Sequence, residues 1–289
     1  MPEIEEIRKK ASILVEALPY VRRFRGSTFV IKYGGSFMDS PDPEVRSRVA
    51  QDLVFLHFVG IKVVVVHGGG KAVTKELSKR GIEANFIDGL RVTDQETIQV
   101  VDEILNYKVN EEVASFVSSY DCDVKRIPGK KTLLCQKISH QTDLGFVGEI
   151  KKVKIEQINE ALKSNRMPIL SSTGSDENGQ CYNINADTAA AQIAIALKAR
   201  RLVYLSDVPG LLKNPNDPKS LLSSLPVNQV EPLIKEGIIS KGMLPKVNSA
   251  VEALNKGVNR VHFIDGRLAH SILLEIFTDQ GIGTEIIHS

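Results

Sequence analysis

The chain has 289 residues, 42% of them hydrophobic, which is enough for the core of one large α/β domain or of two modest lobes. Its 37 Lys and Arg residues nearly balance 35 Asp and Glu residues, and the net charge of +2 gives no electrostatic reason to expect nucleic acid or an anionic membrane as a partner. The three scattered cysteines form no C-x-x-C pair, and no uncharged stretch approaches the roughly 18 residues of a membrane helix, so we expect a cytoplasmic protein that binds a small molecule.

The N-terminal segment predicts an amphipathic helix, because apolar residues recur with the helical period over Ile4–Leu18, and we expect Pro19 to end it. Thr28–Lys32 and Ile61–Val66 are β-branched runs typical of buried strands. Glu44–Phe58, between them, has the helical period. Strand, helix and strand together predict a βαβ unit, whose two strands run parallel.

The same alternation continues through the middle of the chain. Lys71–Arg80 has the helical period, and Thr93–Glu96 matches a capping box that opens a long helix toward Tyr120. Three strand-like runs joined by short polar links predict a hairpin layer: Cys122–Ile127, Thr132–Ile138 and Val147–Val153. Met167–Ser171 follows as another buried strand.

The last part of the chain also alternates. Asp187–Ala199 is an alanine-rich helix, Leu202–Leu205 is a strand, and Asn214–Lys219 is a loop of Pro, Asn and Asp residues. We place the boundary between two lobes near Arg200. The alternation of helix and strand continues through four further segments: Val230–Lys235, Pro245–Asn255, Val261–Ile264 and Ala269–Phe277.

Two strand ends carry glycines. In the first, Lys32 ends a strand and Gly34 and Gly35 form the turn, so that backbone amides can approach an anion, although a tight turn beside a solvated lysine explains this motif equally well. The second, His67–Gly70, runs straight into a helix. Its three glycines are harder to explain by folding alone, since each weakens the fold by roughly 0.5 to 1 kcal/mol relative to alanine. Because ligands bind at the carboxyl ends of parallel strands, we expect both ends to face one crevice.

Neither a P-loop nor a dinucleotide fingerprint is present, which leaves phosphate chemistry in which lysines neutralise the transferring phosphoryl group. Lys246 lies in the first turn of a helix opened by Pro245, near the positive end of the helix dipole, and an anionic ligand would remove that conflict. An exposed surface lysine is the alternative. Arg91, just before the long helix, could clamp a carboxylate through two hydrogen bonds or make a surface salt bridge.

Tyr182–Asp187 puts three short polar side chains at alternate positions. Capping explains Asn185 and part of Asp187, whereas Asn183 is left for a ligand and Asp187 could orient two lysines. Leu205–Gly210 ends another strand with a turn on which a nucleotide could rest. The six histidines show no metal-ligand spacing and no G-x-S-x-G elbow is present, so we expect neither a zinc site nor a hydrolase.

Taken in chain order, seven segments resemble the motifs of the amino-acid kinase family: K-Y-G-G-S, H-G-G-G-K, G-L-R-V-T-D, D-L-G-F-V-G-E-I, Y-N-I-N-A-D, L-S-D-V-P-G and G-M-L-P-K-V. The resemblance covers almost the whole chain. G-L-R-V-T and N-I-N-A-D together are similar to the members that act on N-acetylglutamate. The resemblance therefore implies ATP-dependent phosphorylation of the side-chain carboxylate of N-acetylglutamate, the second step of arginine biosynthesis.

The same resemblance implies an α/β fold, an open αβα sandwich with a mainly parallel central sheet. Its parts would be an N-terminal helix (residues 1–26), a lobe that binds acetylglutamate and makes the dimer contact (27–199), and an ATP-binding lobe (200–289). Lys32 and Lys246 would stabilise the transferring phosphoryl group, and Asp187 would hold both lysines. The residues expected to bind acetylglutamate are Gly68, Gly69, Arg91 and Asn183.

ATP would arrive with Mg²⁺, for which we expect no dedicated protein site. The residues expected near the nucleotide are Gly34, Gly35, Leu205, Ser206, Asp207, Val208, Pro209, Gly210, Ser240, Lys241 and Gly242.

Feedback-inhibited members of the family resemble this chain in the extra N-terminal helix and in the tail Leu274–Thr284. That resemblance implies inhibition by arginine near Tyr20, Glu275 and Gly283, and dimers interlaced by their N-terminal helices into a hexamer. Packing of the helix onto its own subunit is the alternative. Whether a PII-type signalling protein binds is left open.

Two rival functions remain. Another member of the family, such as a glutamate 5-kinase, would have similar glycine loops but would not be expected to share Arg91 and Asn183 in these contexts. An arginine-responsive sensor could have kept the fold and lost catalysis. Intact Lys32, Asp187 and Lys246 argue against the sensor.

Overall fold

A computed structural model describes residues 2–34, 43–240 and 242–288 of the chain. A mainly parallel sheet of eight strands forms its centre, in the order β12-β14-β13-β11-β1-β2-β8-β5. The strands of this sheet are β1 (Thr28–Tyr33), β2 (Lys62–His67), β5 (Val124–Ile127), β8 (Met167–Ser171), β11 (Arg201–Ser206), β12 (Ser224–Pro226), β13 (Arg260–Asp265) and β14 (Thr284–Ile287). Only the pairing of β13 with β14 is antiparallel.

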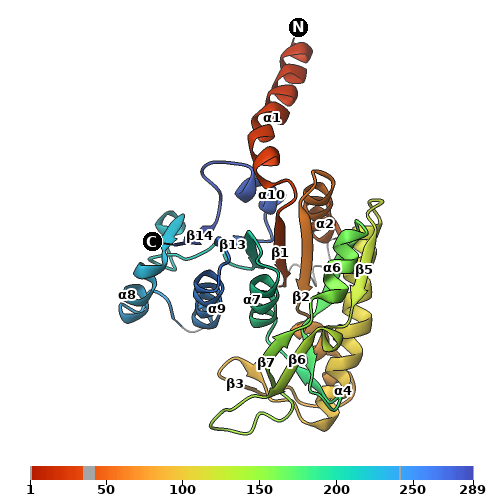
Figure 1. The fold of residues 1–289 in the computed structure, drawn as a ribbon. Helices are drawn as coiled ribbons and strands as arrows, with labels where there is room; N and C mark the ends of the chain where they lie inside the picture. The colour runs from red at the N-terminus through yellow and green to blue at the C-terminus, as the bar shows by residue number, and fades with distance from the viewer. Residues whose placement is uncertain (1, 35–42, 241, 289) are drawn as a thin grey trace.

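Helices pack against both faces of this sheet (Figure 1). They are α1 (Pro2–Phe24), α2 (Pro43–Phe58), α3 (Gly70–Lys79), α4 (Gln95–Glu103), α5 (Asn110–Ser118), α6 (Glu156–Lys163), α7 (Ala186–Ala196), α8 (Val230–Lys235), α9 (Met243–Asn255) and α10 (Ser271–Ile276). The expected αβα sandwich with a mainly parallel sheet is confirmed. No helix in these described ranges combines the length and the apolar character needed to cross a bilayer.

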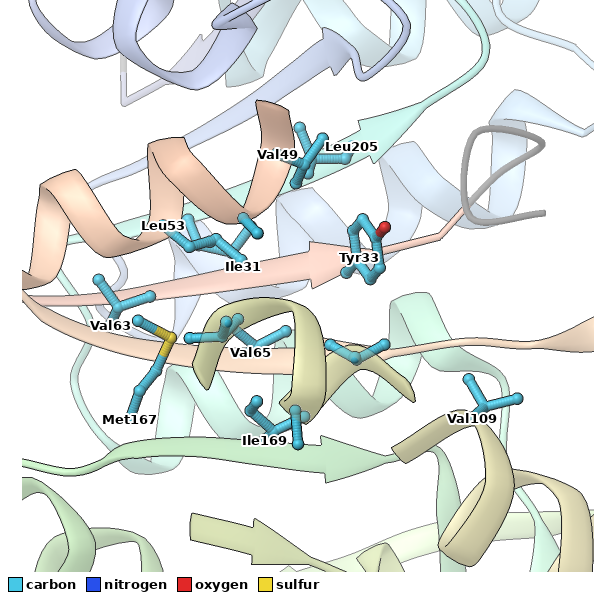
Figure 2. Close-up of a cluster of buried hydrophobic side chains, with 14 of the residues drawn as sticks. Ile31, Tyr33, Val49, Leu53, Val63, Val65, Val109, Met167, Ile169 and Leu205 are labelled. Atoms are coloured by element: carbon cyan, nitrogen blue, oxygen red, sulfur yellow. The ribbon is translucent and has the colours of Figure 1, made fainter. Parts of the chain in front are cut away.

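Alternate residues of the central strands feed two hydrophobic cores. In Figure 2, Ile31 of β1 and Val65 of β2 lie in the core that also holds Val49 and Leu53 of α2. The intervening residues, such as Val64, face the core that contains α7 and α9. A strand buried on both faces needs apolar residues at every position, which explains the β-branched runs in the sequence.

Two small sheets lie beside the central one. One has four strands in the order β10-β9-β6-β7, and the other is the hairpin of β3 and β4. Their bounds are β3 (Phe86–Ile87), β4 (Leu90–Arg91), β6 (Leu133–Lys137), β7 (Gly148–Val153), β9 (Thr173–Ser175) and β10 (Cys181–Asn183). The expected hairpin layer is thus β6 with β7, whereas the first of the three predicted runs was wrongly grouped with it, because β5 pairs in parallel with β8 at the edge of the central sheet.

Two helix boundaries differ from the prediction. Pro19 does not end the first helix, which continues to Phe24. Proline in a helix interior removes one hydrogen bond, but Pro19 is exposed and water can replace the lost donor. The N-cap of α4 is Asp94 and not Thr93, since the Asp94 carboxylate accepts from the Thr97 amide at 2.8 Å while buried Thr93 donates to the Arg91 carbonyl.

The long helix predicted toward Tyr120 is present in three parts. A π-helical segment, η2 (Ile104–Val109), joins α4 to α5. Its asparagine Asn106 is buried and accepts from the hydroxyls of Ser171 and Thr173, just past the end of β8. A π-helical turn often marks a functional site, and this one lies against the carboxyl edge of the sheet.

Candidate active site

The two glycine-bearing strand ends lie side by side, as expected for parallel strands. Lys32 of β1 pairs with Val66 of β2, and Tyr33 pairs with His67. The Gly68 amide donates to the Tyr33 carbonyl at 2.9 Å. On its other side β1 pairs with β11, where Lys32 is level with Tyr204. Three strand ends therefore meet at one edge of the sheet.

A pocket of about 250 Å³ opens at this edge, and we call it the glycine-edge pocket. Its lining brings together most of the predicted catalytic and substrate residues. Those residues are Lys32, Gly68, Gly69, Arg91, Asn183 and Asp187, whereas Lys246 is not part of the lining. Apolar side chains, among them Phe86 and Leu105, form the rest of its wall.

Asp187 holds two lysines at this pocket. Its carboxylate lies 3.1 Å from Lys32 Nζ and 2.5 Å from Lys246 Nζ, although the two lysines come from opposite parts of the chain. Burial lowers the pKa of Lys32, and Asp187 offsets this only in part. Burial alone would raise the pKa of Asp187, but the two ammonium groups bring it below its usual value. One carboxylate between two cations leaves a net positive charge that suits an anion.

The start of α7 fixes Asp187. The side chain of Asn185 caps this helix by accepting from the Asp187 and Thr188 amides, at 2.9 and 3.1 Å. Gly34 has a related role, since a Cβ there would lie 2.5 Å from Lys32 Nζ and would push the ammonium group away from Asp187. Capping and the missing Cβ together hold the lysine and carboxylate pair in one geometry.

The second glycine loop leads directly into α3. Gly69 has a φ of +147°, and a Cβ there would lie 2.7 Å from Leu105 Cδ2, so glycine is required at this position. Gly69 provides no side-chain cap for α3, which leaves the first amides of the helix facing the loop. The Gly68 amide, in contrast, already donates to the Tyr33 carbonyl.

Arg91 is buried and makes no surface salt bridge among the described residues. Its Nη2 donates to the Gly70 carbonyl and to the Thr74 hydroxyl, both at 2.8 Å, and the guanidinium lies 4.7 Å from the Phe86 ring centroid. Burial lowers its pKa. Nη1 is buried and has no hydrogen-bond partner among the described residues, so one nitrogen remains for an anionic ligand.

We expected the side chain of Asn183 to be left for a ligand, but it already makes a hydrogen bond within the protein. The Asn183 Nδ2 donates to the Thr93 hydroxyl at 3.1 Å, because the two residues meet where β10 passes the loop before α4. Asn183 still lines the pocket, and its amide oxygen has no hydrogen-bond partner among the described residues. Thr93 fixes the orientation of the side chain.

Of the predicted nucleotide residues that the structure describes, only Gly34 lines the glycine-edge pocket. Leu205 and Ser206 are buried at the carboxyl end of β11, and Gly210 has a φ of +142° where its backbone packs on Thr284. Ser240 and Gly242 lie just before α9. Gly35 and Lys241 fall outside the described residues. No cluster of acidic, histidine or cysteine side chains in the described ranges could hold a metal ion.

A second pocket of about 240 Å³ lies at the amino ends of β11 and β13, and we call it the amino-edge pocket. Tyr20 and Glu275 line it, as the arginine hypothesis expected, but Gly283 does not. Glu275 is buried at 2.7 Å from His262 Nδ1, and its other oxygen accepts from the Ile282 and Gly283 amides at 2.8 and 2.9 Å. Gly283 thus holds the Glu275 carboxylate in place without lining the pocket itself.

Three further residues of this pocket were missed from the sequence: Arg201, Arg260 and His262. Burial, together with the neighbouring arginines, lowers the pKa of Arg201 to about 9. Arg260 pairs with Glu285 at 2.6 Å, and His262 Nε2 is buried with no partner among the described residues. All three sit within ordinary strand patterns, and no local motif distinguishes them.

The comparisons with known proteins agree on one family. The model of the "Amino acid kinase family" matches residues 27–265. The acetylglutamate kinase of Syntrophomonas wolfei is 47% identical over 284 residues, which cover 97% of this chain and 98% of that protein. The acetylglutamate kinase of Clostridioides difficile is 45% identical over 280 residues, covering 96% of this chain and 97% of that protein.

Solved structures give the same fold. The N-acetylglutamate synthase of Neisseria gonorrhoeae, complexed with coenzyme A and L-arginine, superposes with a TM-score of 0.82 at 26% identity. The match covers 96% of this chain but 65% of the synthase, so this chain spans less than two thirds of that protein. The carbamate kinase of Giardia lamblia bound to AMP-PNP matches with a TM-score of 0.66 at 17% identity, covering 91% of this chain and 99% of that chain, and this likeness concerns the fold alone.

Proposed function

The chain belongs to the amino acid kinase family, and from that premise we propose that it transfers a phosphoryl group from ATP to the side-chain carboxylate of N-acetyl-L-glutamate. The product would be N-acetyl-L-glutamyl 5-phosphate, in the second step of arginine biosynthesis. One observation carries this proposal: Lys32 and Asp187, to which Lys246 is bonded, share a pocket with a buried arginine whose Nη1 has no hydrogen-bond partner among the described residues. The names and lengths of the similar kinases support it.

In the proposed reaction Arg91 binds the α-carboxylate of acetylglutamate, which directs the side-chain carboxylate toward Lys32. An ionised carboxylate oxygen attacks the γ-phosphorus, an O–P bond forms, and the bond to the ADP oxygen breaks. No proton has to move in this step. Lys32 and Lys246 neutralise the charge on the transferring group, and Asp187 keeps both lysines in place. No covalent intermediate with the protein is required.

Mg²⁺ would neutralise charge on the ATP phosphates. Among the described residues that line the glycine-edge pocket, Asp187 alone has an acidic side chain. Each of its two carboxylate oxygens lies within 3.1 Å of a lysine ammonium group. It is therefore poorly placed to bind a cation as well. We propose that the ion is held by the nucleotide, with Asp187 serving the lysines alone.

We further propose that arginine inhibits the enzyme from the amino-edge pocket. Buried Glu275 offers a carboxylate to a guanidinium group, and Arg201 offers a cation to an α-carboxylate. The structural neighbour solved with L-arginine supports this choice of ligand. Activity that does not change in millimolar arginine would remove the proposal.

We also propose that α1 joins dimers into a hexamer. Four apolar side chains within two turns of this helix are exposed, and the helix projects from the rest of the chain (Figure 1). They are Ile13, Leu14, Val15 and Leu18. A dimer mass for the intact chain in light scattering would contradict the hexamer.

One assay tests the main proposal: ATP turnover with N-acetylglutamate against free glutamate, each with and without arginine, with the acyl phosphate trapped as a hydroxamate. We expect hydroxamate from N-acetylglutamate and little from glutamate. A preference for free glutamate would instead identify another kinase of the family. No hydroxamate from either substrate would leave a binding protein without catalysis.

A further inference from the structure

His67, the last residue of β2, has no exposed surface and no part in the proposed reaction. Both of its ring nitrogens have partners. Nδ1 lies 2.7 Å from the carbonyl oxygen of Gly68, and Nε2 lies 3.0 Å from Nδ2 of Asn110, at the start of α5. A buried imidazole between a glycine loop and a helix start could fill space only, or could set the geometry of the loop.

Groups of fixed polarity at both ends determine the protonation of this network. The Gly68 carbonyl can only accept, so Nδ1 must carry the proton. The Ile169 carbonyl, 3.0 Å from Asn110 Nδ2, can also only accept, and Arg126 Nε, 3.2 Å from Asn110 Oδ1, can only donate. The amide of Asn110 is thereby oriented to donate to Nε2. Burial lowers the pKa of His67 to about 4, which keeps the ring neutral near neutral pH, and the hydrogen bonds at its two nitrogens select the tautomer.

The direction of every donor is then the same. Arg126 donates to Asn110, Asn110 donates to His67, and His67 donates to the Gly68 carbonyl. A chain of this kind polarises along its length, because each donor strengthens the next. The final bond is made to the peptide that joins Gly68 to Gly69.

The Gly68 to Gly69 peptide is trans, so its N–H points opposite to its C=O. The carbonyl is turned toward His67. The Gly69 N–H therefore points away from the buried ring, on a residue that lines the glycine-edge pocket, and it has no acceptor among the described residues. If the peptide between Gly68 and Gly69 could flip, the Gly69 N–H would no longer point toward the pocket.

We infer that His67 is a positioning residue: by holding the Gly68 carbonyl, it aims the Gly69 amide at the carboxylate substrate, and Asn110 selects the tautomer that makes this possible. This inference rests on the proposed function for the identity of the substrate. The alternative is that His67 serves only to fill the core, in which case any side chain of similar size would suffice.

Two substitutions separate these roles. An asparagine side chain reaches about as far as Nδ1 and can still donate to Gly68, whereas a glutamine reaches about as far as Nε2 and contacts Asn110 instead. We expect His67→Gln to raise the KM for N-acetylglutamate about tenfold, the effect of one lost hydrogen bond, and to leave the KM for ATP unchanged. We expect His67→Asn to stay within about twofold of wild type for both. Equal KM values in the two variants, or a shift shared by both substrates, would overturn the inference.

A second measurement reads the tautomer in the wild-type protein and needs a variant only to assign the signals. Nitrogen-15 spectra of the histidine rings distinguish the two neutral tautomers, and we expect His67 to be protonated at Nδ1, assigned by the loss of its signals in His67→Asn. Protonation at Nε2 would overturn the inference directly. If wild type does not phosphorylate N-acetylglutamate, the proposed function fails, whereas the tautomer result still decides whether His67 holds the Gly68 carbonyl.

Discussion

The two pockets of this protein lie at opposite edges of one sheet and are built in different ways. Arg201 lines the amino-edge pocket and Lys32 lines the glycine-edge pocket, and they lie on the neighbouring strands β11 and β1. Arg201 pairs with Phe29, three residues before Lys32 on β1. About 10 Å of strand separates them. The glycine-edge pocket uses backbone amides and a few charged side chains at strand ends, whereas the amino-edge pocket uses side chains from α1, β11, β13 and the C-terminal segment.

This difference teaches where chemistry can be found in a sequence. The carboxyl ends of parallel strands converge, so a glycine run after a strand indicates a site without knowledge of the rest of the fold. No comparable sequence pattern indicates a site at the amino ends of the strands. A pocket there depends on segments that only tertiary structure brings together, such as Tyr20 and Asp279, whose side chains bond at 2.5 Å.

The largest expected effect tests the charge at the glycine edge. We expect Lys32→Ala to lower kcat by about 10² to 10³, or about 2.7 to 4 kcal/mol of barrier, as when one electrostatic stabiliser of a transition state is lost. Steady-state kinetics with both substrates measures it. Lys79→Ala is the matched control, because this lysine is exposed and pairs with Glu76 on the surface of the same helix. Wild-type turnover in Lys32→Ala would refute its catalytic role.

Arg91 tests whether the same pocket binds the substrate carboxylate. We expect Arg91→Ala to raise the KM for N-acetylglutamate by about 10- to 100-fold and to spare the KM for ATP, since hydrogen bonds to charged groups contribute about 1.5 to 3 kcal/mol. Arg80→Ala provides the comparison, because Arg80 is a surface residue bonded to Glu76 and Glu103. Equal effects on the two KM values would count against the clamp.

Glu275 tests the amino edge. Burial on its own would raise the pKa of Glu275, but His262 and the amides of Ile282 and Gly283 lower it below the value of 4.5 in an unfolded chain. A carboxyl with a depressed folded pKa stabilises the fold above its unfolded pKa and loses that contribution as the pH falls through its folded pKa. We expect Glu275→Gln to cost about 1 to 2 kcal/mol at pH 7, and the difference from wild type to narrow below about pH 4.5.

Chemical denaturation at a series of pH values measures this difference. The same variant should respond less to arginine while its KM values stay those of wild type, which separates the amino edge from the glycine edge. A gap in stability that stays constant from pH 7 to pH 3 would show that the Glu275 charge is not responsible. Altered substrate KM values without arginine would show that the two pockets are not independent.

Much of the fold could be predicted from the sequence because its local patterns agree with its packing. The central residues of β1 and β2, Phe29–Ile31 and Val63–Val66, are all apolar because both faces of these strands are covered, and the glycines come directly after the strands. The predicted division into two lobes between residues 199 and 200 stays a prediction. Strand β1 of the first predicted lobe pairs directly with β11 of the second, so one sheet runs through both.

What could not be predicted depended on contacts between distant segments. Thr93 matched a capping motif, yet its hydroxyl bonds to Arg91 and Asn183 while Asp94 caps the helix, because a nearby strand gave Thr93 other partners. The short strand β14 was missed since its four residues carry no strong pattern. The role of His67 was hidden for the same reason, because Asn110 lies 43 residues further along the chain.

Strand β11 has a consequence for how the two pockets communicate. All six of its residues are buried and it is bonded on both sides, to β1 and to β13, so it cannot slide or bend without breaking two ladders. Ligands that bind at the two ends of β11 therefore contact one rigid strand. Each ligand must change the binding affinity of the other by the same factor. If arginine binds the amino-edge pocket as proposed, the factor by which it weakens substrate binding equals the factor by which substrate weakens arginine binding, and calorimetric titration measures that factor.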